Sequence, residues 1–156
     1  MPRVVPPPLT LEDQDVHPIL GGGLGAYFHS VIGEAGGLTR VGVHLEVLPP
    51  GARSSFRHWH AAEDEMVYVL SGEVVLIEDV ETPLQAGEAA CWPAGHPVGH
   101  CLENRSAAEA RYLVIGTRER VDTVHYPDHD LVTHKEGIGR RHTHADGRPR
   151  GPEVGI

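Results

Sequence analysis

His58-Trp59-His60-Ala61-Ala62-Glu63-Asp64-Glu65 is the stretch of sequence that decides the fold of this chain. In a β-strand, residues two positions apart project from the same face, so His58 and His60 can point together. Neutral imidazoles are good ligands for zinc, copper, iron or nickel. Glu65 lies five residues beyond His60, which on one unbroken strand would place it on the opposite face. Residues 61–64 must therefore turn or bulge, so that Glu65 opens a second strand facing the same interior.

A third histidine, His100, lies in a separate downstream segment, where it alternates with apolar residues that share its face. Three imidazole nitrogens and one carboxylate oxygen leave positions open for water or a substrate on a six-coordinate metal. This donor set favours Fe(II), Mn(II) or Ni(II), and it also suits Zn(II). The sequence therefore predicts a site for one divalent transition metal (Fe, Mn, Ni or Zn), formed by His58, His60, Glu65 and His100.

The composition limits the range of partners. A chain of 156 residues predicts one domain that is long enough to bury a core. Its formal net charge of −9 argues against nucleic acid and anionic membranes. Because there are only two cysteines, Cys91 and Cys101, no disulfide framework is expected, and a reducing cytoplasm fits. No stretch approaches a membrane span, and the start of the chain lacks the apolar core of a signal peptide.

The chain falls into three parts. Residues 1–38 are rich in proline and glycine, which predicts an extended arm with one short strand at residues 26–32. Residues 39–118 alternate short apolar segments with turn signals, a pattern typical of a β-sandwich or barrel. Residues 119–156 are polar and contain several histidines, which predicts a tail that packs on the surface. The strands expected in the central part are residues 41–48, 54–60, 65–70, 73–78, 82–85, 88–92, 98–102 and 110–117.

Two other segments that contain histidine are expected to face solvent. His44 and Glu46 alternate with apolar neighbours on the segment 41–48, which predicts a polar outer face. His142-Thr143-His144 is a second histidine pair, but no carboxylate or apolar strand follows it. This pair is therefore expected in a solvated tail.

The order and spacing of these residues resemble the two motifs of the cupin superfamily. The first motif is represented here by Gly51, His58, His60, Glu65 and Gly72. The second is represented by Gly87, Pro93-Ala94-Gly95, His100 and Asn104. The match covers residues 51–104 by motif, and residues 39–118 by strand pattern.

The second motif departs from the family pattern in one place. The spacer from Gly95 to His100 is two residues longer than usual, which makes His96 a competitor for the role of third histidine. The interval from His100 to Asn104 keeps the family register. That interval favours His100 as the ligand and places the insertion within residues 96–99.

The resemblance implies an all-β fold, a double-stranded β-helix (jelly-roll) barrel with an extended N-terminal arm and an irregular C-terminal tail. Cupins of this kind are usually homodimers, and the arm often pairs with the neighbouring subunit. The wider sequence is similar to a group of small, single-domain bacterial cupins that are often labelled sugar-phosphate isomerases. A label of this kind rests on fold and has to be tested against the site.

The leading functional hypothesis is metal-dependent, isomerase-like chemistry on a small polar or anionic substrate bound in the barrel. An isomerase needs a base within reach of the substrate carbon. The candidates for this base or for another catalytic role are Glu65, His96 and Tyr112. The arginines that could bind an anionic group are Arg53, Arg105 and Arg118.

Two alternatives remain open from the sequence. The same four ligands could hold Fe(II) in a dioxygenase, with positions left for O2 and substrate. The chain could also be a non-catalytic domain that binds or senses a small ligand. O2 uptake by the iron-loaded protein would distinguish the first alternative, and tight ligand binding without turnover would distinguish the second.

Overall fold

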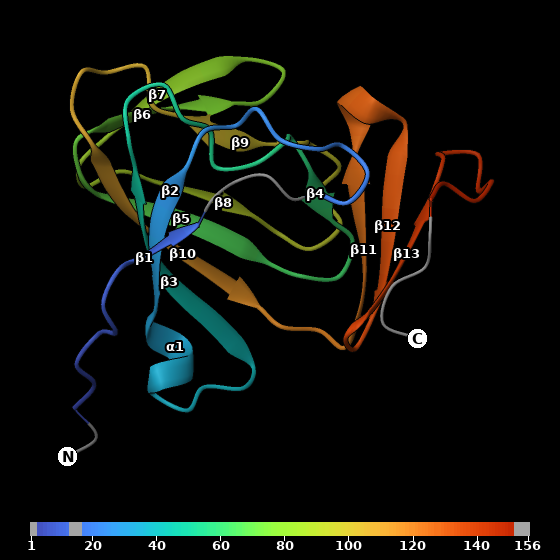
Figure 1. Ribbon diagram of the computed structural model, residues 1–156, viewed down its shortest axis with the longest axis horizontal. Helices are drawn as coiled ribbons and strands as arrows, with labels where there is room; N and C mark the ends of the chain where they lie inside the picture. Colours follow the sequence, from blue (N-terminus) through green and yellow to red (C-terminus); the bar gives the residue numbers. More distant parts are fainter. Residues whose placement is uncertain (1–2, 13–16, 152–156) are drawn as a thin grey trace.

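The computed structural model describes residues 3–12 and 17–151 (Figure 1). The predicted arm and tail are therefore described only in part, since residues 1–2, 13–16 and 152–156 lie outside these ranges. Within the described ranges, nearly all of the regular structure is β-strand, with one short helix, α1 (Ile32–Ala35), and one 3-10 turn, η1 (Pro127–His129). Among the described residues, neither helical segment has the length and apolar character that a membrane crossing requires.

The strands of residues 3–12 and 17–151 form three antiparallel sheets. In chain order they are β1 (Thr10–Glu12), β2 (Tyr27–Val31), β3 (Val41–Leu48), β4 (Trp59–His60), β5 (Glu65–Ser71), β6 (Glu73–Ile77), β7 (Glu81–Gln85), β8 (Ala89–Trp92), β9 (Cys101–Glu103), β10 (Ala110–Thr117), β11 (Val121–Tyr126), β12 (Leu131–Glu136) and β13 (Gly139–Thr143). The largest sheet has the order β1-β2-β3-β10-β5-β8. The other two have the orders β7-β6-β9 and β13-β12-β11-β4. This all-β architecture confirms the predicted fold class.

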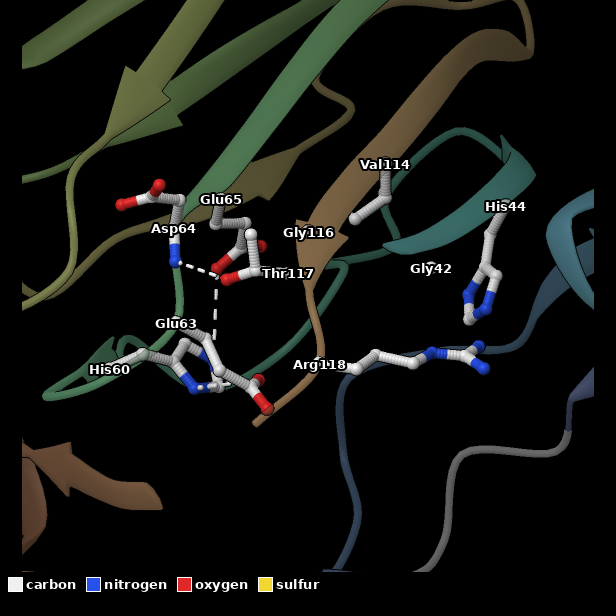
Figure 2. A pocket seen from close by; sticks show the side chains of 10 residues that line it. All are labelled: Gly42, His44, His60, Glu63, Asp64, Glu65, Val114, Gly116, Thr117 and Arg118. Carbon is white, nitrogen blue, oxygen red and sulfur yellow. Dashed lines mark hydrogen bonds and ion pairs between the residues drawn. The ribbon is translucent and has the colours of Figure 1, made fainter. Parts of the chain in front are cut away.

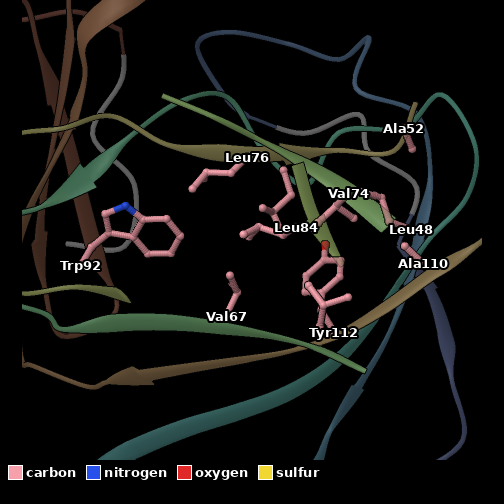
Figure 3. Packing of buried hydrophobic residues seen from close by; sticks show 11 residues of the cluster. Leu48, Ala52, Val67, Val74, Leu76, Leu84, Trp92, Ala110 and Tyr112 are labelled. Carbon is pink, nitrogen blue, oxygen red and sulfur yellow. The ribbon is translucent and has the colours of Figure 1, made fainter. Parts of the chain in front are cut away.

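The hydrophobic core fills the space between the six-stranded and three-stranded sheets (Figure 3). Val67 from β5, Val74 from β6 and Tyr112 from β10 meet there, and Trp92 closes the end of the cluster nearest the histidines. Each of these residues alternates with outward-facing neighbours, as a half-buried strand requires. The core therefore occupies one end of the barrel and leaves polar residues at the other.

The inner face of β3 differs from the prediction. β3 pairs with β10 so that Glu46 lies opposite Tyr112 and His44 lies opposite Val114. Tyr112 is fully buried in the barrel, and residues paired across a ladder share one face. His44 and Glu46 therefore face the interior, so the prediction that they form a polar outer face is wrong. The alternate residues of β3, such as Leu45, face outward instead.

The segment after residue 118 also differs from the prediction, which was an irregular tail on the surface. It forms β11, β12 and β13, and β11 pairs with the short strand β4 (Figure 1). His142 and Thr143, expected in solvent, are 3% and 2% exposed. Of the two histidines in this motif, only His144 lies at the surface, where its Nδ1 is 2.8 Å from the Asp130 carboxylate. The segment is therefore a third sheet, which β11 joins to β4.

The described part of the N-terminal region joins the large sheet. β1 pairs with β2, and β2 pairs with β3. The Ser30 hydroxyl donates a hydrogen bond to the carbonyl of Pro7 at 2.7 Å, which ties the arm to the sheet edge. The short strand predicted at residues 26–32 corresponds to β2.

Candidate metal centre

The three histidines and Glu65 come from neighbouring segments at the polar end of the barrel. His58 and His100 form an isolated antiparallel bridge, in which each N–H donates to the other residue's carbonyl. β4 carries His60 and ends there, and residues 61–64 turn the chain so that Glu65 begins β5. The turn predicted from the spacing of His60 and Glu65 is therefore present in the fold.

The structure brings three of the four predicted ligands together. One potential ligand atom from each of His58, His60 and Glu65 lies within 4.8 Å of the other two. His100 lies beside this group, with its Nε2 atom 3.1 Å from Oε2 of Glu65. A ring nitrogen lone pair and a carboxylate oxygen this close need a cation between them, either a proton or a metal ion. The donor set and its spacing fit a divalent transition metal.

In each of the three histidine rings, the Nδ1 atom lies within hydrogen-bond distance of an oxygen acceptor. Nδ1 of His58 is 2.8 Å from the Phe56 carbonyl, and Nδ1 of His100 is 3.1 Å from the Val98 carbonyl. Nδ1 of His60 is 2.6 Å from the carboxylate of Asp122. Because carbonyl and carboxylate oxygens accept, each Nδ1 carries the proton. Each Nε2 is then the nitrogen left to bind a metal, and on His100 a metal would replace the proton that Nε2 shares with Glu65.

Burial and charge prepare two of the groups for metal binding. Burial lowers the pKa of His58 to about 4, so its imidazole is neutral near pH 7. Burial alone would raise the pKa of Glu65, but the hydrogen bond with His100 and the nearby histidines outweigh it and lower the pKa to about 2. Neutral imidazole and ionised carboxylate are the forms that bind a metal.

His96 and His100 occupy different environments. His96 is exposed in the loop between β8 and β9. His100 is 4% exposed, and its ring is stacked on Trp92 with centroids 3.7 Å apart. Of the two competing histidines, the fold places His100 beside Glu65.

Glu46 is a functional candidate that the sequence reasoning missed. A cavity of about 130 Å³ is lined by Glu46 together with His58, Glu65 and Tyr112. The Tyr112 hydroxyl donates a hydrogen bond to Oε2 of Glu46 at 2.8 Å. Burial raises the pKa of Glu46 to about 7, and it raises the pKa of Tyr112 well above its usual value. The signal available in the sequence was the strand pattern of segments 41–48 and 110–117, which in the fold pair so that Glu46 lies opposite the catalytic candidate Tyr112.

Among the three candidate arginines, Arg118 lines a cavity with the proposed ligands. Its guanidinium group reaches a cavity of about 190 Å³ that is also lined by His44, His60 and Glu65 (Figure 2). The absence of a side chain at Gly42 makes room for it, since a Cβ there would lie 3.1 Å from Nε of Arg118.

Arg53 and Arg105 are engaged elsewhere. Arg53 pairs with Glu103 at 2.9 Å, and Arg105 pairs with Glu81 at 2.6 Å. Each side chain is 45% exposed, beside the three-stranded sheet. A solvated arginine paired with a glutamate is a common surface feature and gives no sign of substrate binding.

Comparison with known proteins places this site in context. The family model for a cupin domain matches residues 44–116. A crystal structure of a sugar phosphate isomerase of the cupin superfamily from Silicibacter pomeroyi is 38% identical, with a TM-score of 0.84 and coverage of 94% of this chain and 96% of that one.

A second structure, from Acidithiobacillus ferrooxidans, is assigned provisionally as a sugar phosphate isomerase. It is 28% identical, with a TM-score of 0.76 and coverage of 81% of both chains. A predicted oxalate decarboxylase from Thermotoga maritima, 23% identical with a TM-score of 0.55 over 74% of this chain and 94% of that one, shares the fold alone. A search of the curated proteins finds no match.

Proposed function

The chain belongs to the cupin superfamily, and from that membership and the geometry of its site we propose that it is a metal-dependent isomerase acting on a small anionic substrate, such as a sugar phosphate. The observation that carries the proposal is one cavity lined by His60 and Glu65 at one side and Arg118 and His44 at the other. The similarity to solved structures described as sugar phosphate isomerases supports the same substrate class.

The metal ligands we propose are His58, His60, Glu65 and His100. A bound Fe, Mn, Ni or Zn ion would supply Lewis acidity toward a substrate carbonyl or hydroxyl. The chain's own contribution is to hold the neutral imidazole of His58, the ring of His60 and the ionised carboxylate of Glu65 close together, with His100 beside them. The stacking of Trp92 on His100 restricts the ring to one orientation and excludes water from one of its faces.

Glu46 is the group we assign to proton transfer. Interconversion of an aldose and a ketose moves one proton between adjacent carbons and a second proton between their two oxygens, with no net oxidation or reduction. With its pKa near 7, Glu46 can accept the proton from one carbon and return it to the next at neutral pH. The hydrogen bond from Tyr112 fixes the orientation of the carboxyl group. The two cavities share Glu65 and Val114 as lining residues, so a substrate in the larger one lies next to Glu46.

Arg118 and His44 form the end of the cavity that we assign to the substrate anion. Both side chains contact the Glu34 carboxylate, by an ion pair from Arg118 and at 3.6 Å from Nε2 of His44. A carboxylate oxygen is therefore already accommodated between them. A substrate phosphate would replace Glu34 there and form charge-assisted hydrogen bonds with the guanidinium group.

The proposed assembly is a homodimer that buries the outer face of the large sheet. This face, formed by β3, β5 and β10, carries partly exposed apolar side chains: Val43, Leu45, Met66, Tyr68, Leu113 and Ile115. A contiguous apolar face of this kind is typical of an interaction surface. The free thiols of Cys91 and Cys101 are compatible with the reducing cytoplasm that we propose as its location.

The proposal is tested by proton exchange. The protein is loaded anaerobically with each of the four metals and incubated with aldose and ketose phosphates in D2O. We expect deuterium at the carbon next to the carbonyl and conversion between the two sugars. Replacing the cationic arginine in Arg118→Met should raise KM by about 10- to 100-fold, the value of a charge-assisted hydrogen bond to an anion.

Arg53→Met is the matched control, because it removes a guanidinium group that pairs with Glu103 outside this cavity. Its kinetics should equal those of the wild type. Absence of exchange with every metal and substrate, or equal kinetics of Arg118→Met and the wild type, would contradict the proposal. O2 consumption by the iron-loaded protein would instead indicate a dioxygenase.

A further inference from the structure

The acceptor beside Nδ1 of His60 is a side chain, that of Asp122, whereas the other two histidines use the backbone. His58 and His100 each use the backbone carbonyl of the residue two positions earlier. His60 uses the carboxylate of Asp122, with Oδ2 at 2.6 Å from Nδ1. Asp122 lies in β11, which is outside the matched cupin domain at residues 44–116.

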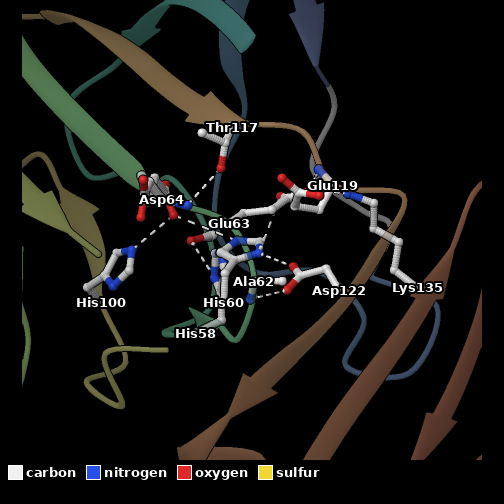
Figure 4. Close-up of polar contacts among 12 residues, drawn as sticks. His58, His60, Ala62, Glu63, Asp64, His100, Thr117, Glu119, Asp122 and Lys135 are labelled. Atoms are coloured by element: carbon white, nitrogen blue, oxygen red, sulfur yellow. Dashed lines mark hydrogen bonds and ion pairs between the residues drawn. The ribbon is translucent and has the colours of Figure 1, made fainter. Parts of the chain in front are cut away.

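The same carboxylate also holds the turn that leads to Glu65. Its second oxygen, Oδ1, accepts the backbone N–H of Ala62 at 2.8 Å. The side chain of Asp122 is 0% exposed. A buried carboxylate is costly unless its oxygens are satisfied, so this one requires both donors to stay in place. One side chain from the third sheet thereby fixes the ring of His60 and the chain direction just before Glu65 (Figure 4).

We infer that Asp122 is a positioning residue that holds His60 in its Nδ1–H tautomer, so that the third sheet is part of the metal centre. The inference rests on the proposed metal site and concerns how the chain prepares it. A carboxylate can only accept from Nδ1, which leaves the lone pair on Nε2, the nitrogen that lies 3.7 Å from Oε2 of Glu65.

An alternative for the same residues is a second cation site. His60, Glu63 and Asp122 also offer donor atoms within 4.8 Å of one another. However, both oxygens of Asp122 are already used, and Oε1 of Glu63 receives the Lys135 ammonium and the N–H of Glu119. The ammonium group supplies the positive charge that a second metal would bring. These contacts favour the positioning role.

The substitution Asp122→Asn tests the inference at constant size. An asparagine has one acceptor and one donor group, so it cannot accept from both Ala62 and His60. If its carbonyl stays with Ala62, its NH2 donates to Nδ1 of His60, which favours the tautomer with the ring proton on Nε2. We expect Zn²⁺ affinity, measured by competition with a chromophoric chelator, to fall by about 10- to 100-fold.

Asp130→Asn is the matched control. Asp130 has the same two contacts at the surface, accepting from the Ala145 N–H and contacting Nδ1 of His144. This variant should bind Zn²⁺ as the wild type does. Equal affinity of Asp122→Asn and the wild type would overturn the inference while leaving the metal centre intact. Binding of two Zn²⁺ per wild-type chain, with one lost in Asp122→Asn, would overturn it in favour of the second cation site.

The tautomer itself gives a measurement that does not depend on the variant folding. In the metal-free wild type, the ¹⁵N chemical shifts of the His60 ring should show a protonated Nδ1 and an unprotonated Nε2. A protonated Nε2 with a bare Nδ1 would overturn the inference, even if the protein binds metal. If the wild type bound no metal but had the expected tautomer, the proposed metal centre would fail and the positioning of the ring would stand.

Discussion

Glu46 is a partly buried carboxyl group whose charge depends on pH in the neutral range. Burial raises its pKa from 4.5 to about 7, although the Tyr112 hydrogen bond opposes this shift. Between these two pH values the folded protein keeps a proton that the unfolded chain has lost. The free energy of unfolding that Glu46 contributes is therefore highest below about pH 4.5, falls as the pH rises to about 7, and stays low above it.

The variant Glu46→Gln should remove this dependence, because its side chain is neutral at every pH. In metal-free protein, we expect its free energy of unfolding to rise relative to the wild type between pH 4.5 and 8, by about 3 kcal/mol. Denaturant unfolding at several pH values measures the difference. Glu81→Gln is the control, since Arg105 lowers the pKa of Glu81 and the change should have the opposite sign. Parallel stability curves for Glu46→Gln and the wild type would contradict the assignment.

Individual site residues differed in how far the sequence could predict them. His58, His60 and Glu65 followed from spacing, because alternation on a strand and a forced turn restrict where their side chains point. Glu46 did not, because alternation separates two faces of a strand without saying which one is inside. On β3 the outward face is the apolar one, so the usual assignment of apolar residues to the interior gave the wrong side.

At the scale of elements, the turn between β5 and β6 depends on a glycine with no room for a side chain. Gly72 has φ of 77°, and a Cβ there would lie 2.8 Å from the Glu109 carbonyl oxygen and 2.9 Å from Cα of Ala110. Gly87, between β7 and β8, has φ of 91° but nothing within 4 Å of the same position. The two turns share the backbone strain and differ in packing.

Alanine substitutions should therefore have unequal effects. Gly87→Ala should lower the free energy of unfolding by about 1–2 kcal/mol, the cost of a left-handed conformation for an L-residue. Gly72→Ala should lower it by about 3–4 kcal/mol, because a backbone clash is added to the same strain. Chemical denaturation of both variants measures the difference. Equal losses would show that the neighbouring strand moves aside freely.

The third sheet is the element that the sequence did not reveal. β11 to β13 are rich in polar residues and histidines, so they lack a regular alternation of apolar residues. That alternation predicted the bounds of β3 and β10, at residues 41–48 and 110–117, to within one residue. β11 pairs with β4, a strand of only two residues. Such a pairing depends on the tertiary arrangement, and local sequence patterns contain little information about it.

At the scale of the whole molecule, the apolar outer face of the large sheet should form a homodimer. Tyr68 is 38% exposed on this face, opposite Leu113 on β10. Tyr68→Glu places a charge in the proposed interface and should raise the dimer dissociation constant by more than about 100-fold. Analytical ultracentrifugation of wild type and variant measures this change.

Ile138→Glu serves as the control for a surface charge. Ile138 is 89% exposed at the turn between β12 and β13, away from the outer face of the large sheet. This variant should sediment as the wild type does. A wild type that is monomeric at micromolar concentration, or a Tyr68→Glu variant that stays dimeric, would refute the proposed interface.

The metal content of the purified protein tests the convergence of the four ligands most directly. Elemental analysis should find about one divalent transition metal per wild-type chain, as a single site with three histidines and one carboxylate predicts. His58→Ala and His60→Ala should each retain less than about a tenth of it. The surface variant His144→Ala should retain all of it. Unchanged metal content in His58→Ala and His60→Ala would contradict the account.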